Sequence, residues 1–486
     1  MLGGEFDLYE DDRLVATVDG KHSEAEILYG KLILSCWGEG WSRSWRVDRC
    51  EFTAARARLR CAKQMGTTVC TLDLHRGAAR KGIAESRHEF TATLRRLIEN
   101  NLSGLKVGRA IAARDDPHQL SVVHSRLIIH ERGRLIAGIG IGEREPQAHI
   151  DATLGAGLIW LDALRLKGRG ANRLMIFAPR GRTSVIAARM VAVAPAGAAL
   201  SLYEVDEAER KIEPLAAFDQ GDLMDNLRKA GIRPVWPGER SASRASALAD
   251  SVIQLAPDLI DTRWQNGWTV FSIRGLEFAR ASVARNMIRF GLDQQKTTLN
   301  EGNRSKLEAL AAEIAATRAP ESQQRNADLF RSYSERWLES IIRRRIVAVD
   351  PTLDPRYVYT QVPAYRGEQR SFIDLLTVTR SGRLAVIELK VSEDAEFPFQ
   401  GLDYWLRVEW HRRRGDFQRR GYFAGLQLAD APPLLYLVAP LFRFHASTRL
   451  IAGSITERVP VYRIGINDDW RRGVRVLLSE RLNGIE

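Results

Sequence analysis

The sequence predicts a mixed α/β protein (an α+β mixed sheet) whose N-terminal region is rich in β-strands. Short apolar runs separated by turn residues fill residues 1–85, which is typical of strands. After Glu85, segments with the 3.6-residue period of a helix alternate with apolar strands. A chain of 486 residues is too long for one hydrophobic core, so we expect several domains.

Composition excludes several classes of protein. The chain has no run of about eighteen apolar residues, so no transmembrane helix and no membrane partner are predicted. The N-terminal segment MLGGEFDLYEDD is acidic and does not resemble a signal peptide, so we expect a cytoplasmic location. The cysteines lack the close C-x-x-C pairs of a zinc site, which favours buried thiols. They are Cys36, Cys50, Cys61 and Cys70.

Four regions are expected along the chain. Residues 1–85 form the β-rich domain, and residues 86–215 form a first α/β domain. Residues 216–330 connect it to a second α/β domain at 331–486. Within the connecting region, Gly231–Ser243 is rich in proline, glycine and serine, which indicates a loop or linker.

The two α/β domains have the pattern of an internal repeat. Gly-Arg-Leu occurs at 133–135 and again at 382–384. Leu174-Met-Ile-Phe-Ala-Pro179 then matches Leu435-Tyr-Leu-Val-Ala-Pro440, and another apolar strand follows in each copy. If the repeat is real, both copies should have the same strand order and equivalent Gly-Arg-Leu turns. The alternative is chance, because any two α/β domains share apolar strands and glycine turns.

The second copy contains charged residues inside a predicted hairpin. Asp374 precedes the apolar run Leu375–Val378, and a Ser-Gly turn leads to a second strand, Leu384–Val391. Glu388 and Lys390 lie two residues apart in this strand, so their side chains point to the same face. We expect Asp374 to project from the neighbouring strand onto that face.

These residue types fit metal chemistry. A buried charge without a partner costs several kcal/mol. Asp374 and Glu388 can hold Mg²⁺ (or Mn²⁺) through oxygen, which leaves positions for water and phosphate. Lys390 can then place the attacking water and stabilise charge on the phosphate. The ordinary alternative is an exposed Glu–Lys pair on a surface strand.

The spacing of Asp374 and Glu388-Leu389-Lys390 resembles the PD-(D/E)xK nuclease superfamily, with Ile373-Asp374 in place of its Pro-Asp. Downstream, Gln400 and Tyr404 match the Gln-xxx-Tyr element of RecB-like members. One helical turn separates these two residues, so both can face the same site. The resemblance covers roughly the last third of the chain, and each motif alone is short.

An upstream segment resembles the helix that supplies the first acidic residue in this superfamily. It is Ser334–Ile342, for which Ser334 is the expected N-cap. Glu339 is the expected metal ligand, because it precedes two isoleucines as in family members. Glu335, one turn earlier, is the substitute.

The resemblance implies a restriction-endonuclease-like core and a metal-dependent deoxyribonuclease, either endo- or exonucleolytic, that acts in DNA repair, restriction or phage defence. The first copy implies a degenerate nuclease-like domain. Counted from the shared Gly-Arg-Leu, Ser125 takes the place of Asp374, and Gly138–Ile141 takes the place of Glu388 and Lys390. The first copy would then serve packing, DNA contact or dimerisation, with a homodimer as one form of the protein.

The net charge of +12 fits a polyanionic partner, although an arginine-rich proteome gives the same balance. Two basic clusters flank the predicted site, and phosphate neutralisation is their expected role. The residues expected to contact nucleic acid are Arg343, Arg344, Arg412 and Arg413. DNA is the expected partner, and RNA suits the same charges.

Two other functions fit the same sequence. The first is a nucleic-acid-binding or assembly protein that uses a nuclease scaffold without cleaving. The second is an RNA-directed or nucleotide-sensing effector with residues 1–85 as its sensor. The intact Asp-Glu-Lys set of the second copy argues against a silent scaffold, because the first copy has lost the same positions.

Overall fold

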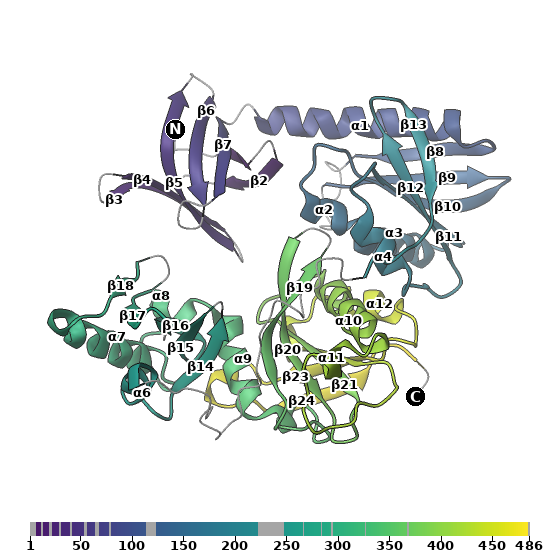
Figure 1. Cartoon of the computed structure of the whole chain (residues 1–486). Coiled ribbons are helices and arrows are strands. Elements are labelled where there is room, and N and C mark those ends of the chain that lie inside the picture. Colours follow the sequence, from purple (N-terminus) through teal and green to yellow (C-terminus); the bar gives the residue numbers. More distant parts are fainter. Residues whose placement is uncertain are drawn as a thin grey trace. The chain divides into compact units, whose positions relative to one another are not determined.

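The protein has a mixed α/β architecture with four β-sheets (Figure 1). This computed structural model describes residues 6–484 apart from gaps at 11–12, 19–21, 29–30, 39–40, 53–55, 64–67, 77–78, 113–122, 222–246, 266, 283, 293–294, 326 and 367–368. The predicted linker Gly231–Ser243 lies outside the described residues. Among the described helices, none combines the length and apolar character needed to cross a bilayer.

The chain divides into two compact units. Unit 1 comprises Met1–Ala187 and Gly197–Ala217, and unit 2 comprises Ala188–Ala196 and Phe218–Glu486. Each unit contains two of the four sheets, and each is described by itself below.

The first sheet of unit 1 is antiparallel and confirms the β-rich N-terminal region. Its strand order is β2-β1-β7-β6-β5-β4-β3. The strands are β1 (Phe6–Glu10), β2 (Arg13–Val18), β3 (Ser23–Leu28), β4 (Lys31–Gly38), β5 (Trp41–Phe52), β6 (Arg56–Lys63) and β7 (Thr68–Arg76). Cys36, Cys61 and Cys70 are buried in its core, as predicted. Cys50 is exposed, so the prediction of a buried thiol is wrong there.

The second sheet of unit 1 follows a long helix, α1 (Ala79–Asn101). Its strands are β8 (Leu105–Ile111), β9 (Ser125–Glu131), β10 (Arg134–Gly140), β11 (Arg173–Pro179), β12 (Ala199–Asp206) and β13 (Lys211–Leu215). Between them lie α2 (Gln147–Asp151), α3 (Thr153–Leu166) and α4 (Ser184–Met190). α1 packs Leu94 and Ile98 against one face of the sheet, which contains Met175 and Phe177.

The first sheet of unit 2 has five antiparallel strands in sequence order. They are β14 (Ile260–Gln265), β15 (Trp268–Ile273), β16 (Leu276–Ser282), β17 (Met287–Phe290) and β18 (Thr297–Thr298). α6 (Ala247–Ile253) and α7 (Arg304–Thr317) pack on it.

The second sheet of unit 2 follows α8 (Asp328–Arg331) and α9 (Ser334–Arg344). Its strands are β19 (Tyr359–Arg366), β20 (Gln369–Val378), β21 (Leu384–Leu389), β22 (Leu434–Pro440), β23 (Val461–Ile466) and β24 (Val476–Arg481). The helices between them are α10 (Phe397–Arg413), α11 (Asp416–Arg419) and α12 (Thr448–Gly453).

Both six-stranded sheets have the strand order that the internal repeat predicts. β8–β13 and β19–β24 each lie in sequence order across their sheet. In both, the first three strands are antiparallel, the next two pairs are parallel, and the last pair is antiparallel. The parallel registers agree as well: Ala137 pairs with Leu174 and Leu174 with Leu200, while Val386 pairs with Leu435 and Leu435 with Val461. The two Gly-Arg-Leu turns also coincide, since Gly133 and Gly382 have φ angles of +82° and +85°.

The register corrects one detail of the repeat. In the first copy Arg126 pairs with Ile139, which is the counterpart of Glu388. In the second copy Leu375 pairs with Ile387. Moving one residue along each antiparallel strand places Asp374 opposite Glu388. Arg126, and not Ser125, therefore occupies the place of Asp374. The reason is that the second hairpin has a turn one residue longer than the first.

The two equivalent glycines provide a matched test of the hairpins. A Cβ at Gly133 would meet no atom within 4 Å, whereas at Gly382 it would lie 2.2 Å from the carbonyl oxygen of Gln427. Gly133→Ala should therefore cost about 1–2 kcal/mol, from the left-handed backbone alone. Gly382→Ala should cost more, because the carbonyl must also move. Hydrogen exchange of the peptides that span each hairpin measures both costs, and equal losses of protection would contradict the expected difference.

Candidate active site

The predicted hairpin is confirmed, and it lies in the middle of the C-terminal sheet. β20 and β21 pair antiparallel, and β21 pairs parallel with β22 on its other side. The backbone N–H of Lys390 continues this pairing by donating to the Val438 carbonyl at 3.0 Å. Every residue of β21 is buried, because α9 packs beside Leu389 on one face and α10 packs beside Leu437 on the other. Glu388 pairs with Leu437, so its side chain faces α10.

Three polar side chains lie in a row across β19, β20 and β21. The register of β19 and β20 places Gln361 opposite Asp374, and Asp374 lies opposite Glu388. Asp374 Oδ2 accepts the backbone N–H of Leu389 at 3.0 Å. Its Oδ1 accepts the Gln361 amide at 3.2 Å, and the same amide donates to Glu339 Oε2 at 2.5 Å. Gln361 therefore joins Glu339 of α9 to Asp374 of the sheet.

Gln361 was not predicted from the sequence. It has a φ angle of +54°, which is unusual for a residue other than glycine. Residues held in this conformation gather at functional sites, where the surrounding structure compensates their strain. The only sequence signal is the position of Gln361 in the strand before Asp374, and a single sequence does not distinguish it from any other polar residue in a strand.

Glu339 and Glu388 are buried and Asp374 is partly buried, and the surroundings of all three carboxyl groups disfavour ionisation. Burial, with a further contribution from the nearby Glu339 carboxylate, raises the pKa of Asp374 to about 7. Burial and the Asp374 carboxylate raise the pKa of Glu388 well above its usual value. Burial also raises the pKa of Glu339. Among the described residues, Glu388 Oε2 has no hydrogen-bond partner, although it is buried.

Lys390 comes directly after β21 and is surrounded by carboxylates. Its Nζ is 3.8 Å from Glu335 Oε1 and 3.9 Å from Asp394 Oδ2. Burial alone would lower the pKa of Lys390, but the carboxylates of Glu388 and Glu335 outweigh it and raise this pKa. Lys390 therefore stays protonated at neutral pH and acts as a cation, not as a base.

The Gln-xxx-Tyr residues lie on α10, as expected. The Gln400 amide donates to the Tyr404 hydroxyl at 3.3 Å, which shows that both face the same way. Tyr404 is buried, and burial together with the Glu388 carboxylate raises the pKa of its hydroxyl. Tyr404 therefore belongs to the same cluster as Glu388 and remains a neutral hydrogen-bond donor.

α9 differs from the prediction at its first residue. The helix begins at Ser334, and Tyr333 is at the N-cap position with a φ angle of +51°. The Ser334 hydroxyl donates to the Arg331 carbonyl, so it does not cap the helix. Glu339 is buried on this helix, while the Glu335 side chain is 41% exposed and lies near Lys390. The structure therefore brings Glu339 to Asp374 and Glu335 to Lys390.

The site fits a hard cation, although it is not a preformed metal cage. Within the described part of the chain, no group of three or more His, Cys, Asp and Glu side chains has the arrangement of a metal site. Mg²⁺, however, is usually held by one or two carboxylates and keeps water and phosphate oxygens as its other ligands. Asp374 and the unpaired Oε2 of Glu388 would provide such a pair. Glu339 would join only if Gln361 released it.

The four arginines predicted to contact nucleic acid all make ion pairs inside the protein. Arg343 and Arg344 both donate to Asp261 of β14, at 2.9 and 3.0 Å. Arg412 and Arg413 both donate to Glu409 of α10. Of these four, only Arg413 exposes more than half of its side chain. The main role of the other three is therefore to pair with carboxylates of the protein itself.

A buried arginine holds α10 in place. Arg189 lies in the segment Ala188–Ala196 of unit 2, and its side chain has no exposed surface. It donates two hydrogen bonds to Asp403, both 2.9 Å long, and one to Glu396 at 2.9 Å. Asp403 immediately precedes Tyr404, so this ion pair fixes the helix turn that carries the Gln-xxx-Tyr residues. We expect Arg189 to be a positioning residue.

No known protein-family model matches the chain, and no curated protein matches it in sequence.

The raised pKa of Asp374 predicts a pH dependence of stability. In the unfolded chain this group has its usual pKa of 3.8, and in the folded protein its pKa is about 7. An acid with a raised folded pKa opposes folding once it ionises, so stability should fall as pH rises from about 4 to 7. Asp374→Asn should remove this loss and be more stable than wild type at pH 8 without metal. The difference should be a few kcal/mol, since one pKa unit corresponds to about 1.4 kcal/mol.

Urea unfolding of both proteins at pH 5 and pH 8 measures this effect. Asn keeps an oxygen that can accept the Leu389 N–H, so the substitution changes mainly the charge. An Asp374→Asn protein that is less stable than wild type at pH 8 would contradict the expected repulsion.

The Arg189 ion pair predicts a large cost for one substitution. Arg189→Met leaves Asp403 buried without its cation, which should cost about 3–5 kcal/mol. Arg449→Met is the matched control, because Arg449 pairs with Glu480 but exposes 67% of its side chain. The control should cost less than about 1 kcal/mol. Urea unfolding midpoints compare the two, and similar values would show that Arg189 does not hold α10.

Proposed function

We propose that the protein is a metal-dependent nuclease that hydrolyses phosphodiester bonds of DNA with Mg²⁺ or Mn²⁺. The observation that carries this proposal is the buried Glu388 oxygen without a hydrogen-bond partner, beside Asp374 and a protonated Lys390. A buried anionic oxygen of this kind is unfavourable unless it binds a proton or a cation. The resemblance to the PD-(D/E)xK superfamily supports the same reading, because its motif residues converge from α9, β20, β21 and α10.

Each side chain has a role that its surroundings favour. Asp374 and Glu388 would hold the cation, which would supply Lewis acidity and a more acidic bound water. Lys390 carries a fixed positive charge and would stabilise the charge that develops on the phosphate. Tyr404 stays neutral, so its hydroxyl can donate to a phosphate oxygen or to water. Gln361 and Gln400 would orient Asp374 and Tyr404.

The first copy of the repeat supports a catalytic role for the second. At the positions of Glu388 and Lys390 it has Ile139 and Ile141, both buried, and it keeps the same strand order. The sheet can therefore form without charged residues there. The charges of the second copy fit a chemical function better than a structural one. DNA repair, restriction and phage defence are all settings that such a nuclease would suit.

Cleavage assays with matched variants test the proposal. Purified protein with Mg²⁺ or Mn²⁺ should cleave DNA from a panel of single- and double-stranded substrates. Asp374→Asn and Glu388→Gln should each lower the rate by orders of magnitude, and they should abolish the thermal stabilisation that Mn²⁺ gives the wild type. Lys390→Ala should keep this stabilisation and lose cleavage, because it removes a charge that acts on the phosphate.

Glu480→Gln is the control, since Glu480 lies on β24 of the same sheet and pairs with Arg449 and Arg463 outside the site. It should cleave like wild type. Full cleavage by Asp374→Asn would overturn the proposed mechanism. Binding of DNA by the wild type without any cleavage would favour a silent binding protein, and cleavage of the RNA members of the panel alone would change the substrate.

A further inference from the structure

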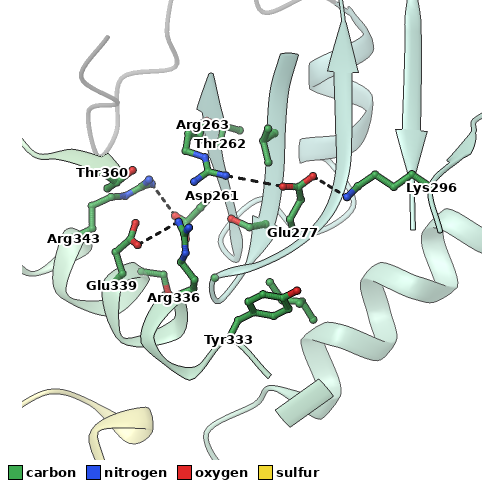
Figure 2. Close-up of a pocket in the computed structure, with 15 residues that line it drawn as sticks. Asp261, Thr262, Arg263, Glu277, Lys296, Tyr333, Arg336, Glu339, Arg343 and Thr360 are labelled. Atoms are coloured by element: carbon green, nitrogen blue, oxygen red, sulfur yellow. Dashed lines mark hydrogen bonds and ion pairs between the residues drawn. The ribbon is translucent and has the colours of Figure 1, made fainter. Parts of the chain in front are cut away.

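A cavity of about 170 Å³ lies between the five-stranded sheet of unit 2 and α9 (Figure 2). Strands β14, β15 and β16 form one wall, and α9 forms another. Glu339 lines this cavity and also hydrogen-bonds the Gln361 amide of the candidate active site. A ligand in the cavity would therefore lie next to the proposed metal-binding carboxylates.

Positive charge exceeds negative charge around this cavity. Glu277 is approached by three cations, with Arg280 at 2.5 Å, Lys296 at 3.0 Å and Arg263 at 4.0 Å. In Figure 2, Arg263 and Lys296 reach Glu277 from opposite sides. Asp261 and Glu339 add two carboxylates, and they face three further cations: Arg336, Arg343 and Arg344. Four of these cations line the cavity itself, Arg263, Lys296, Arg336 and Arg343, against three carboxylates, so the lining has a formal excess of one positive charge.

Arg263 and Arg336 make the two longest of the ion pairs around this cavity. Arg263 is 4.0 Å from Glu277, which is already bonded by two closer cations. Arg336 is 3.7 Å from Glu339. Burial, and then the charge of Arg336, lower the pKa of Arg263. An anion between the two arginines would relieve this repulsion, and phosphate is an anion that guanidinium groups bind through paired hydrogen bonds.

An exposed aromatic ring lies at the edge of the same cavity. Tyr333 lines it, and 52% of this residue is exposed. Its φ angle of +51° is a conformation that costs energy for a residue with a side chain. The ring stands across the cavity from Glu277 in Figure 2. A flat aromatic side chain in solvent, in the same cavity lining as Arg263 and Arg336, is suited to stack on a nucleic-acid base.

We propose that the cavity binds one nucleotide of the nucleic-acid strand, with its phosphate between Arg263 and Arg336 and its base on Tyr333. This inference rests on the proposed nuclease function and defines a subsite for a neighbouring nucleotide. The volume suits a phosphate with part of its sugar, which leaves the base at the rim. A free nucleotide has the same chemistry, but the shared Glu339 wall favours a strand that continues into the active site.

Binding is measured apart from cleavage with the Glu388→Gln protein and a fluorescein-labelled single-stranded DNA oligonucleotide. Arg263→Gln and Arg336→Gln, each added to this protein, should weaken binding and lower the slope of log K against log salt by about one. Tyr333→Ala should weaken binding about 5- to 150-fold without changing the slope, because stacking carries no charge. Tyr333→Phe keeps the aromatic ring, so it should bind as tightly as the Glu388→Gln protein without this change.

Arg304→Gln is the matched control, because Arg304 is an exposed arginine of α7 that pairs with Glu308. Its effect on affinity should be less than twofold. Urea unfolding checks that each variant is folded. If Arg263→Gln does not fold, Tyr333→Ala still tests the subsite. Unchanged binding by Tyr333→Ala and Arg336→Gln would overturn the subsite.

Two further measurements complete the test. The first distinguishes a nucleic-acid strand from a free nucleotide as the source of the phosphate, and the second tests the subsite separately from the nuclease function. A mononucleotide that stabilises the protein but does not compete with the oligonucleotide would overturn the strand subsite in favour of a free ligand. A wild type that cleaves DNA, with rates unaffected by Arg263→Gln and Tyr333→Ala, would overturn the subsite and leave the nuclease. A third outcome is that oligonucleotide binding needs Arg263 and Tyr333 but the wild type does not cleave DNA. This would support the subsite and overturn the nuclease function.

Discussion

The burial of carboxyl groups in the middle of a β-sheet is the constraint on which the C-terminal sheet depends. Glu388 lies in a strand with neighbours on both sides and helices on both faces, so water does not solvate its charge. The surrounding structure compensates in part. Asp374 receives two hydrogen bonds, and Lys390 supplies a positive charge. One oxygen of Glu388 still has no partner among the described residues, and this is the strongest sign that the site is completed by something else.

The two copies of the repeat separate what the fold needs from what the site needs. The order of the strands, the parallel registers and the turn glycines are the same in both sheets. Only the second has acids at the row formed by β20 and β21. Because the first copy buries Ile139 in the place of Glu388, the apolar side chain is an available and stable alternative. A sheet that keeps the costlier residue is best explained by what that residue does.

Local patterns predicted local structure well, and distant contacts set the rest. The period-two spacing of Glu388 and Lys390 predicted the strand and its face, and both motifs of the repeat fall in equivalent strands. The counterpart of Asp374 was misplaced by one residue because the length of a turn cannot be counted from strand patterns alone. Gln361 escaped prediction because its contact with Glu339 depends on the register of β19 and on a left-handed backbone. Similarly, the sequence alone suggests that Arg343 faces solvent. The structure shows that it pairs with Asp261, which is far away in the sequence.

α9 shows how one short helix can connect these parts. Trp337, Leu338 and Ile342 form its buried face and pack in the core of the C-terminal sheet. Arg336, Ser340 and Arg343 recur at intervals of about one helical turn and line the cavity on another side. Glu339 lies where these faces meet, so it borders the cavity and bonds the amide that holds Asp374. A charge that enters the cavity must therefore change the field at Glu339, and through Gln361 the environment of Asp374.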